Sequence, residues 1–233
     1  MAASPARRQR AARGSGDQLR AEILQAARDL LAETGSADEV SIRAVSDVVG
    51  VSAPSIYRHF ADKDALIDAV VAEVFGEFDD VMQTAAADAD NPVDRLRLQG
   101  LAYVRFAREH PEQYRLATTQ GTGGAATVDQ VLGAAVFTNL LGSVAECVRI
   151  GVFAADDDPT EIAMDLWAAA HGIASLQIAK PNLPWGDPDA AAERVMKAAS
   201  IGRALSDLLD DPTPQEFSDW MRTQRANHAD RAD

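Results

Sequence analysis

The sequence predicts an all-α fold, and three observations lead to this prediction. Apolar residues recur every three or four positions along nearly all of the 233 residues, which is the spacing of amphipathic helices. No run alternates convincingly between apolar and polar residues, so we expect no sheet. Prolines, glycines and helix-capping residues divide the pattern into segments of helical length.

The composition is that of a globular protein. Apolar residues make up 47% and charged residues 25% of the chain, which is long enough to bury a sizeable core. The single cysteine, Cys147, excludes a disulfide framework and every Cys-cluster metal site, and we expect it to be a small buried hydrophobic residue. No apolar run is long enough to cross a bilayer, and none follows the basic N-terminus as it would in a secretory signal. We therefore expect a cytoplasmic protein without a membrane partner.

Charge is distributed unevenly along the chain. The net charge is −14, but residues 1–60 carry a net +1 and residues 61–233 a net −15. The first sixteen residues contain four arginines and no acid. One end of the protein can therefore approach a phosphate backbone, whereas the rest would be repelled by it.

The first elements are predicted from their caps. Residues 1–16 are predicted to form a flexible basic arm, and a helix then runs from about Leu19 until Gly35 stops it. Ser41 is placed to cap a second helix, which ends at Gly50.

Further caps divide the remainder of the chain. Ser52 is placed to cap a third, short helix that has Pro54 in its first turn and ends near Phe60. Asp62 is placed to cap a helix over about 63–87. More helices are expected at about 93–110, 111–116, 125–153, 160–179, 188–209 and 214–225, with a flexible break at 121–124.

Residues 41–60 have the pattern of a helix-turn-helix, in which the second of two short helices enters the major groove of DNA. Gly50 permits the left-handed backbone that a tight turn needs. The inner face is predicted to consist of Val45, Val48, Val49, Val51 and Ile56. The outer face of the second helix then carries Ala53, Pro54, Tyr57 and Arg58.

The segment from about residue 19 to 75 resembles the DNA-binding domain of the TetR family of bacterial transcriptional regulators. The matching pieces are residues 23–35, 41–43, 50–52, 55–60 and 63–66. At Val45 and Ser46 the chain departs from the family pattern, which usually has an aliphatic residue followed by Ala. The resemblance implies a three-helix helix-turn-helix domain followed by a larger helical domain for ligand binding and dimerisation.

Several candidate DNA contacts follow from the chemistry of the side chains. The Ser41 hydroxyl and the adjacent backbone N–H can face a phosphate as well as cap the helix. Ala53 and Pro54 offer apolar surface that suits a thymine methyl group. Ser52 and Ser55 can reach a phosphate or a base edge.

The remaining contacts rest partly on the resemblance, which implies that Arg43 lies near the groove, where a bidentate contact to guanine is available. Tyr57 and His59 resemble the phosphate-contacting pair of the family. Lys63 is singled out by local rules, since a cation in the first helical turn opposes the helix dipole by about 0.3–1 kcal/mol, yet suits a phosphate oxygen beside free N–H groups. The basic arm can add minor-groove or phosphate contacts, as the arms of other helix-turn-helix domains do. The alternatives are that Tyr57 is a core aromatic, that Lys63 is a solvated surface charge and that the arm is only a disordered terminus.

A single short reading helix binds DNA weakly, so we expect a homodimer on a palindromic operator of double-stranded DNA. The helices at 160–179 and 188–209 carry apolar residues on more than one face, so each can pack inward and also across a two-fold axis. In the family, the last two long helices usually form this contact. The alternative is that both are core helices of a monomer.

A second, looser resemblance concerns the body. Residues 110–116, with Trp167 and His171-Gly172, resemble a TetR subgroup whose ligand-binding domain carries a Trp…His-Gly signature. It names no ligand, and His171 either bonds a neighbouring helix or lines a pocket. We expect a pocket for an unknown, largely apolar effector among the helices of the body. Its candidate lining residues, each of which is otherwise ordinary core, are Tyr103, Phe106, Phe137, Leu140, Leu141, Trp167, His171 and Leu176.

We find no catalytic or metal-binding constellation, and no cofactor is implied. The four His and one Cys make no metal-ligand spacing, and the glycines at 121–124 follow no strand, so they are not a phosphate cradle. We expect a non-enzymatic regulator, a repressor whose operator binding a small ligand relieves. The alternative is a helical ligand-binding or protein-interaction module with a vestigial reading head. The expected segments are the arm at 1–16, the helix-turn-helix domain at 17–62, the effector-binding and dimerisation domain at 63–225 and a polar tail at 226–233.

Overall fold

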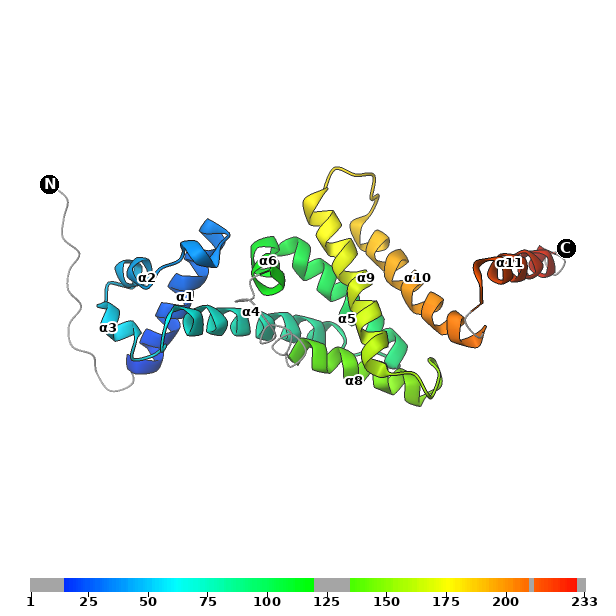
Figure 1. Ribbon diagram of the computed structural model, residues 1–233, viewed down its shortest axis with the longest axis horizontal. Coiled ribbons are helices and arrows are strands. Elements are labelled where there is room, and N and C mark those ends of the chain that lie inside the picture. The colour runs from blue at the N-terminus through cyan, green and yellow to red at the C-terminus, as the bar shows by residue number, and fades with distance from the viewer. Residues whose placement is uncertain (1–14, 120–134, 210–211, 230–233) are drawn as a thin grey trace.

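The computed structural model of the protein describes residues 15–119, 135–209 and 212–229, and within these ranges it is helical with no strand. This confirms the predicted fold class. The helices of the N-terminal end, which we call the head, are α1 (Ser15–Thr34), the short 3₁₀ turn η1 (Ala37–Glu39), α2 (Ile42–Val49) and α3 (Ala53–Ile56). The long helix α4 (Lys63–Ala85) leads from the head into the body (Figure 1).

The body is a bundle of longer helices. Its members are α5 (Pro92–Glu109), α6 (Pro111–Thr119), α8 (Ala135–Arg149), α9 (Pro159–Ala179) and α10 (Pro188–Leu208). Helix α5 packs against α4, α8, α9 and α10, and α9 also packs against α8 and α10. Helix α11 (Pro214–Ala229) lies beyond the bundle, at the end of the molecule opposite the head (Figure 1).

Most predicted helix boundaries lie within a few residues of the observed ones. Helix α1 already begins at Ser15 and α11 continues to Ala229, so helix reaches into the segments expected to be arm and tail. The rest of the arm, the break at 121–124, the start of the helix expected at 125–153 and residues 230–233 lie outside the described residues. The division into domains at residues 62 and 63 stays a prediction.

Two of the predicted caps are present as hydrogen bonds. The Ser41 hydroxyl oxygen accepts from the backbone N–H of Ala44 at 3.1 Å, and an Asp62 carboxylate oxygen accepts from that of Ala65 at 2.8 Å. Each bond satisfies one of the backbone donors that the first turn of a helix leaves free. Helices α2 and α4 therefore each begin directly after the predicted capping residue.

Two serines near the turn make hydrogen bonds that the sequence did not reveal. Ser52 occupies the N-cap position of α3 but makes no capping bond, because its hydroxyl pairs with that of Ser55 at 2.9 Å. The predicted cap at Ser52 is therefore wrong as a hydrogen bond. Ser46, where the family usually has Ala, is buried and donates its hydroxyl to the Ile42 carbonyl at 2.7 Å, so it leaves no unpaired hydroxyl in the core.

The inner face of the helix-turn-helix is mostly as predicted. Val45 and Ile56 are fully buried, and Val49 and Val51 pack against the same core. The prediction that Val48 belongs to this face is wrong, since 61% of its surface is exposed. The inward stripe of α2 runs through Val45 and Val49, and Val48 lies on the flank of this short helix.

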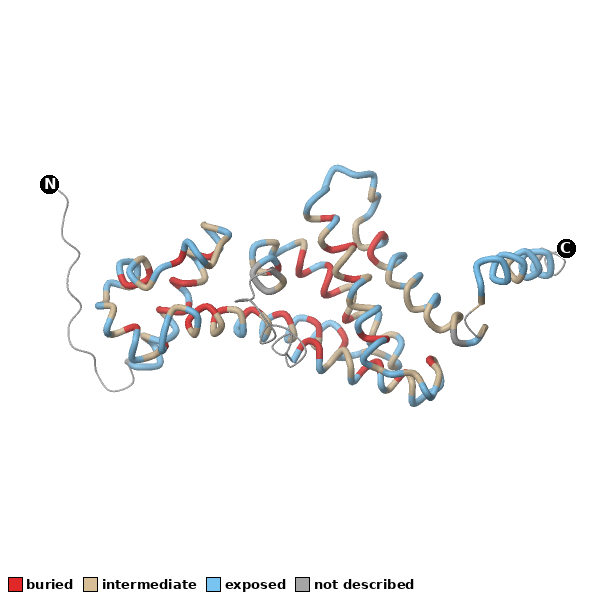
Figure 2. The backbone as a smooth tube through the Cα atoms, viewed as in Figure 1, coloured by how far each residue is buried: buried red, intermediate tan, exposed pale blue. Residues whose placement is uncertain are grey.

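A single buried stripe on α4 belongs to two cores. Val70, Val74, Phe78 and Met82 follow one another at four-residue spacing, which keeps them on one helix face, and all are buried. Val70 and Val74 pack in the head with α1 and α2, whereas Phe78 and Met82 pack in the body with α5 and α9. Figure 2 shows the buried positions recurring along the whole helix. The head therefore cannot tilt without moving the part of α4 that lies in the body.

An ion pair clamps α1 to α4 near the boundary between the two cores. The Arg28 guanidinium donates two hydrogen bonds of 2.5 Å to the two carboxylate oxygens of Glu77. These bonds lower the pKa of Glu77 below its ordinary value. Helix α6 adds a second link, because it packs against both α1 and α4.

The turn after α2 allows a matched test of whether its left-handed backbone requires glycine. Gly50 has φ +74° and Gly76 lies inside α4, and a Cβ added at either position would meet no atom within 4 Å. Gly50→Ala should lower the free energy of unfolding by about 1–2 kcal/mol, because an L side chain disfavours the left-handed conformation. Gly76→Ala should raise it by about 0.5–1 kcal/mol. Denaturant titration followed by circular dichroism measures both, and an unchanged stability of Gly50→Ala would show that the turn does not depend on glycine.

Candidate nucleic-acid interface and ligand cavity

The predicted reading surface is exposed at the tip of the head. Tyr57 has 52% of its surface exposed, and Pro54 and Arg58 beside it are exposed as well. The exposure of Tyr57 is at odds with the alternative that it is a core aromatic. Arg58 donates a hydrogen bond of 3.0 Å to the Ser55 hydroxyl, which in turn pairs with Ser52. The polar groups of α3 therefore form a connected row on its solvent side.

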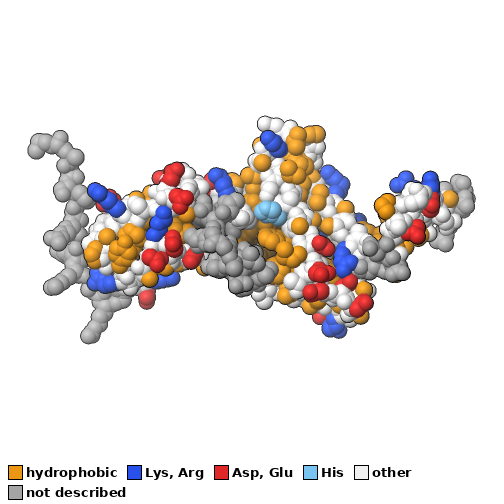
Figure 3. Space-filling view, in the orientation of Figure 1, with side chains coloured by type: hydrophobic (Ala, Val, Ile, Leu, Met, Phe, Trp, Pro, Cys, Tyr) orange, Lys and Arg blue, Asp and Glu red, His pale blue; other side chains and the backbone are white. Residues whose placement is uncertain are grey.

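The other candidates surround this row. Ser41 and Arg43 are exposed at the first turn of α2, whereas Ala53 and His59 are partly buried. The predicted contact residues thus lie within α2, α3 and the segments that flank them, except for Lys63, which is the first residue of α4. Figure 3 shows Lys and Arg side chains over this end of the molecule, interspersed with Asp and Glu. Whether these residues touch DNA stays a prediction.

Lys63 makes a contact that the sequence did not reveal. Its ammonium group donates a hydrogen bond of 3.2 Å to the backbone carbonyl of Asp38 in η1. The side chain is partly buried at the first turn of α4 and ties that helix to the segment between α1 and α2. Lys63 therefore has a structural role, and the phosphate contact remains a second role predicted for it.

The body encloses a cavity of about 1190 Å³ lined by residues of α4, α5, α8, α9 and α10. It is lined by five of the residues proposed from sequence: Tyr103, Phe137, Leu140, Trp167 and His171. Further apolar lining comes from Phe78 and Met82 of α4, which the sequence reasoning missed. These two residues could have been found from the four-residue spacing that continues past the head.

Three other candidates do not line the cavity. Phe106 is buried but stacks on Phe78 with ring centroids 4.3 Å apart, so it supports the wall from behind. Leu141 packs within the cluster between α8 and α9. Leu176 has 51% of its surface exposed, so the expectation that it lines the cavity is wrong. Its neighbours Ile173 and Ala174 take the inward face of α9 instead.

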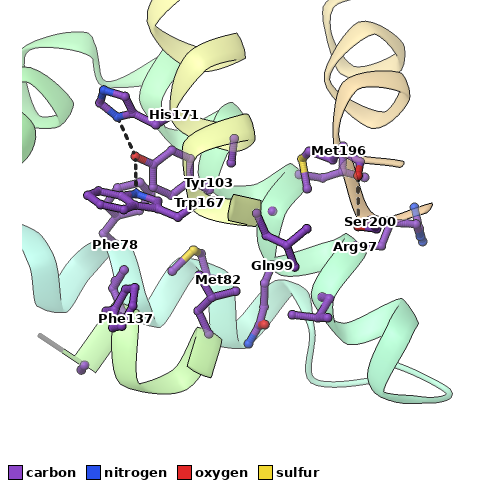
Figure 4. A pocket seen from close by; sticks show the side chains of 18 of the residues that line it. Phe78, Met82, Arg97, Gln99, Tyr103, Phe137, Trp167, His171, Met196 and Ser200 are labelled. Carbon is purple, nitrogen blue, oxygen red and sulfur yellow. Dashed lines mark hydrogen bonds between the residues drawn. The ribbon is translucent and has the colours of Figure 1, made fainter. Parts of the chain in front are cut away.

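One wall of the cavity carries a cluster of polar side chains, which we call the polar hub. It consists of Tyr103 of α5, Tyr114 of α6, and Trp167, His171 and Ser175 of α9. The Tyr103 hydroxyl accepts from the Trp167 indole N–H at 3.2 Å and lies 3.3 Å from Nδ1 of His171 (Figure 4). The Tyr114 hydroxyl lies 2.6 Å from the same Nδ1 and 3.1 Å from the Ser175 hydroxyl.

The polar hub is uncharged near neutral pH. Burial raises the pKa of Tyr103 well above its ordinary value, so the phenol keeps its proton. Burial also lowers the pKa of His171 below its ordinary value, so the imidazole is neutral at pH 7. His171 thus combines both roles left open by the sequence, since it bonds a neighbouring helix and lines the cavity.

The remaining chemistry of the described residues is sparse. Within residues 15–119, 135–209 and 212–229, no group of three His, Cys, Asp or Glu is arranged to hold a metal ion. Cys147 is buried as expected, and burial raises the pKa of its thiol to about 11. Every helix in the same ranges is too short or too polar to span a lipid bilayer.

Solved structures with this fold cover most of the chain. A protein of unknown function from Rhodococcus sp. RHA1 is 27% identical, with a TM-score of 0.66 over 80% of this chain and 95% of the other. A TetR family transcription regulator from Marinobacter aquaeolei VT8 is 18% identical, with a TM-score of 0.63 over 82% of this chain and 97% of the other. The fatty acid degradation regulator FadR from Bacillus halodurans is 17% identical, with a TM-score of 0.65 over 78% and 98%. The latter two likenesses concern the fold alone.

Among curated proteins, the chain is similar to the nucleoid occlusion factor SlmA of Sodalis glossinidius, with 28% identity over 99 residues. The SlmA of Yersinia enterocolitica is matched to the same extent. The similarity covers 42% of this chain and 50% of either relative, so the chain spans about half the length of the curated relatives it matches.

Two family models match the two parts of the molecule separately. Residues 23–70, which include the helix-turn-helix, match the bacterial regulatory proteins of the tetR family. Residues 96–199, which form most of the cavity-bearing body, match the tetracyclin repressor-like C-terminal domain. Because one family model matches the head and the other matches most of the body, the chain belongs to the TetR family of DNA-binding transcriptional regulators.

Proposed function

We propose that the protein is a homodimeric cytoplasmic repressor that releases a palindromic operator when a small, largely apolar ligand fills the cavity. The observation that carries this proposal is the shared helix α4. Phe78 and Met82 line the cavity, and Val70 and Val74 of the same helix belong to the core of the head. The proposal assigns no catalysis to the chain.

Charge supports the way in which DNA would be approached. Residues 61–233 carry a net charge of −15 against +1 for residues 1–60, and helices α2 and α3 lie at the opposite end of the molecule from α11 (Figure 1). A duplex is therefore attracted, or least repelled, where Arg43 and Arg58 are exposed.

Exposed apolar residues support a dimer through the last two long helices of the body. Such residues are normally covered when several lie together on one surface. On α9 and α10 they are Met164, Leu176, Val195, Ile201 and Leu208. A two-fold contact between copies of these helices would bury them and would place two heads side by side.

The ligand would act through the separation of the two heads. An operator holds its half-sites about 34–36 Å apart, one turn of the DNA helix. A ligand that binds better to a subunit with α4 at another angle favours a different separation and so releases the DNA. Helix α6 offers a parallel route. Tyr114 belongs to the polar hub, and the guanidinium of the next residue, Arg115, would lie 3.5 Å from a Cβ added at Gly35, which directly follows α1.

The alternative function is a helical ligand-binding or protein-interaction module whose head no longer reads DNA. The intact caps of α2 and α4 and the exposed row on α3 favour a working head over a vestigial one. A gel shift with the DNA that flanks the gene separates the two, because only a working head retards a fragment at moderate salt.

A salt series on operator binding tests the reading residues. Arg43→Ala should weaken specific binding by about 1–3 kcal/mol and relax base preference, because a base contact is lost. Lys63→Ala should weaken binding to all sequences about equally and lower the salt slope by about one, because a phosphate contact is lost.

The control for both is Arg225→Ala, which removes an exposed cation of α11 at the end of the molecule opposite the head and should leave affinity and slope unchanged. Since Lys63 also bonds Asp38, the unfolding midpoint of Lys63→Ala is measured in parallel. If a folded Lys63→Ala variant binds DNA with unaltered affinity and slope, the phosphate role of Lys63 is wrong.

Oligomeric state tests the proposed dimer contact. Val195→Glu on α10 should give monomers and weaken operator binding, because a charge is placed in an apolar contact. Val81→Glu on α4 is the matched control, since Val81 is 42% exposed against 38% for Val195 and lies on another helix. Sedimentation measures both, and a dimeric Val195→Glu protein would place the contact elsewhere.

A further inference from the structure

The polar hub has one more hydroxyl hydrogen than its central nitrogen can take. The hydroxyls of Tyr103 and Tyr114 both point to Nδ1 of His171, at 3.3 Å and 2.6 Å. A ring nitrogen carries either one lone pair or one hydrogen, so it makes one strong hydrogen bond. The shorter distance gives that bond to Tyr114.

The same result holds for either tautomer of His171. When Nδ1 is an acceptor, Tyr114 donates to its lone pair at the shorter distance, and only a longer, weaker hydrogen bond is left for Tyr103. When Nδ1 carries the hydrogen, it donates to Tyr114, and Tyr103 faces an N–H that cannot accept. The Tyr103 oxygen already accepts from Trp167, and its hydrogen can turn only to Nδ1, which Tyr114 holds at the shorter distance, or to the Tyr114 oxygen itself. Unlike Tyr114, Tyr103 lines the cavity, where a ligand can supply an acceptor of its own.

Charge then selects the kind of acceptor. The hub residues are Tyr, Trp, His and Ser, and the His171 imidazole is neutral because burial lowers its pKa. A carboxylate placed against Tyr103 would therefore be desolvated without a cation beside it, which is costly. Arg97 lines the cavity on the other side, where Figure 4 shows it near Ser200, and it is paired with Asp94 and Glu193. A carbonyl oxygen meets the need of Tyr103 without this penalty.

The rest of the cavity lining indicates the chemistry of the rest of the ligand. Around the hub lie apolar side chains from α4, α5, α8 and α9, namely Phe78, Met82, Leu101, Phe137, Leu140 and Leu166. The other buried polar group of the wall is the amide of Gln99, whose side-chain oxygen has no hydrogen-bond partner among the described residues. This oxygen is an acceptor, so a hydroxyl or N–H on the ligand would satisfy it without adding a charge.

We infer that the cavity takes an uncharged, elongated apolar molecule whose carbonyl oxygen, of a ketone, ester or lactone, accepts a hydrogen bond from Tyr103. This inference rests on the proposed function, because it names the class of effector that fills the cavity. It also assigns a specificity role to Tyr103 and a supporting role to Tyr114, which keeps the His171 nitrogen occupied.

Calorimetric titration of the full chain without DNA tests the inference with a matched pair of probes, 2-decanone and decanoate at pH 7.5. The ketone should bind at least about ten-fold more tightly than the carboxylate, since only the latter must lose its charge hydration unpaired. Methyl decanoate should behave as the ketone does. Equal or tighter binding of decanoate would overturn the inference, as would the failure of all three probes to bind.

A substitution locates the contact. Tyr103→Phe removes only the hydroxyl and should weaken 2-decanone binding about three- to ten-fold while leaving decanoate unchanged. Ser218→Ala removes an exposed hydroxyl on α11, which does not line the cavity, and should leave both affinities within about two-fold. An unchanged affinity of Tyr103→Phe for the ketone would overturn the role of Tyr103, and the probe comparison on the unaltered chain decides the ligand class if this variant does not fold. These titrations contain no DNA, so a failure of ligand binding is distinguished from a failure of operator binding.

Discussion

The structure depends on one helix that serves two hydrophobic cores. Along α4, buried side chains repeat every four residues, and the stripe passes from the head to the body between Val74 and Phe78 without a break. A helix held by packing on both sides of this point is stiff, because neither half can rotate without opening a core. The Arg28–Glu77 pair fixes α1 to the helix at the same level. The side chains that line the cavity, Phe78 and Met82, and those that pack in the head, Val70 and Val74, therefore belong to one continuously packed helix.

Much of the fold could be predicted because its determinants are local. Caps at Ser41 and Asp62, the left-handed turn at Gly50 and the helical period of the apolar residues each act within one turn of helix, so the sequence alone carries them. Val48 was assigned wrongly because exposure at the flank of a short helix depends on which neighbours cover it. The bond from Lys63 to Asp38 joins residues 25 positions apart and has no local pattern that would announce it.

The candidate site was predictable in part for the same reason. Trp167 and His171 lie one helical turn apart, so the sequence places them on one face, but their partners come from α5 and α6, which only the tertiary fold brings near. Tyr114 stood within the quoted 110–116 pattern, yet its bond to His171 joins residues 57 positions apart. Phe106 and Leu176 show the limit of the apolar pattern, which indicates that a residue is hydrophobic but not whether it faces a cavity, a core or solvent.

The link from cavity to head is tested most directly by the distance between the two reading helices of a dimer. A spin label at Arg58→Cys reports it by pulsed electron resonance, in a Cys147→Ala background because the native thiol lines the cavity. The account predicts a separation compatible with half-sites about 34–36 Å apart when the cavity is empty, and a shift of several ångström when a ligand saturates it. An identical distance distribution in both states would contradict the account.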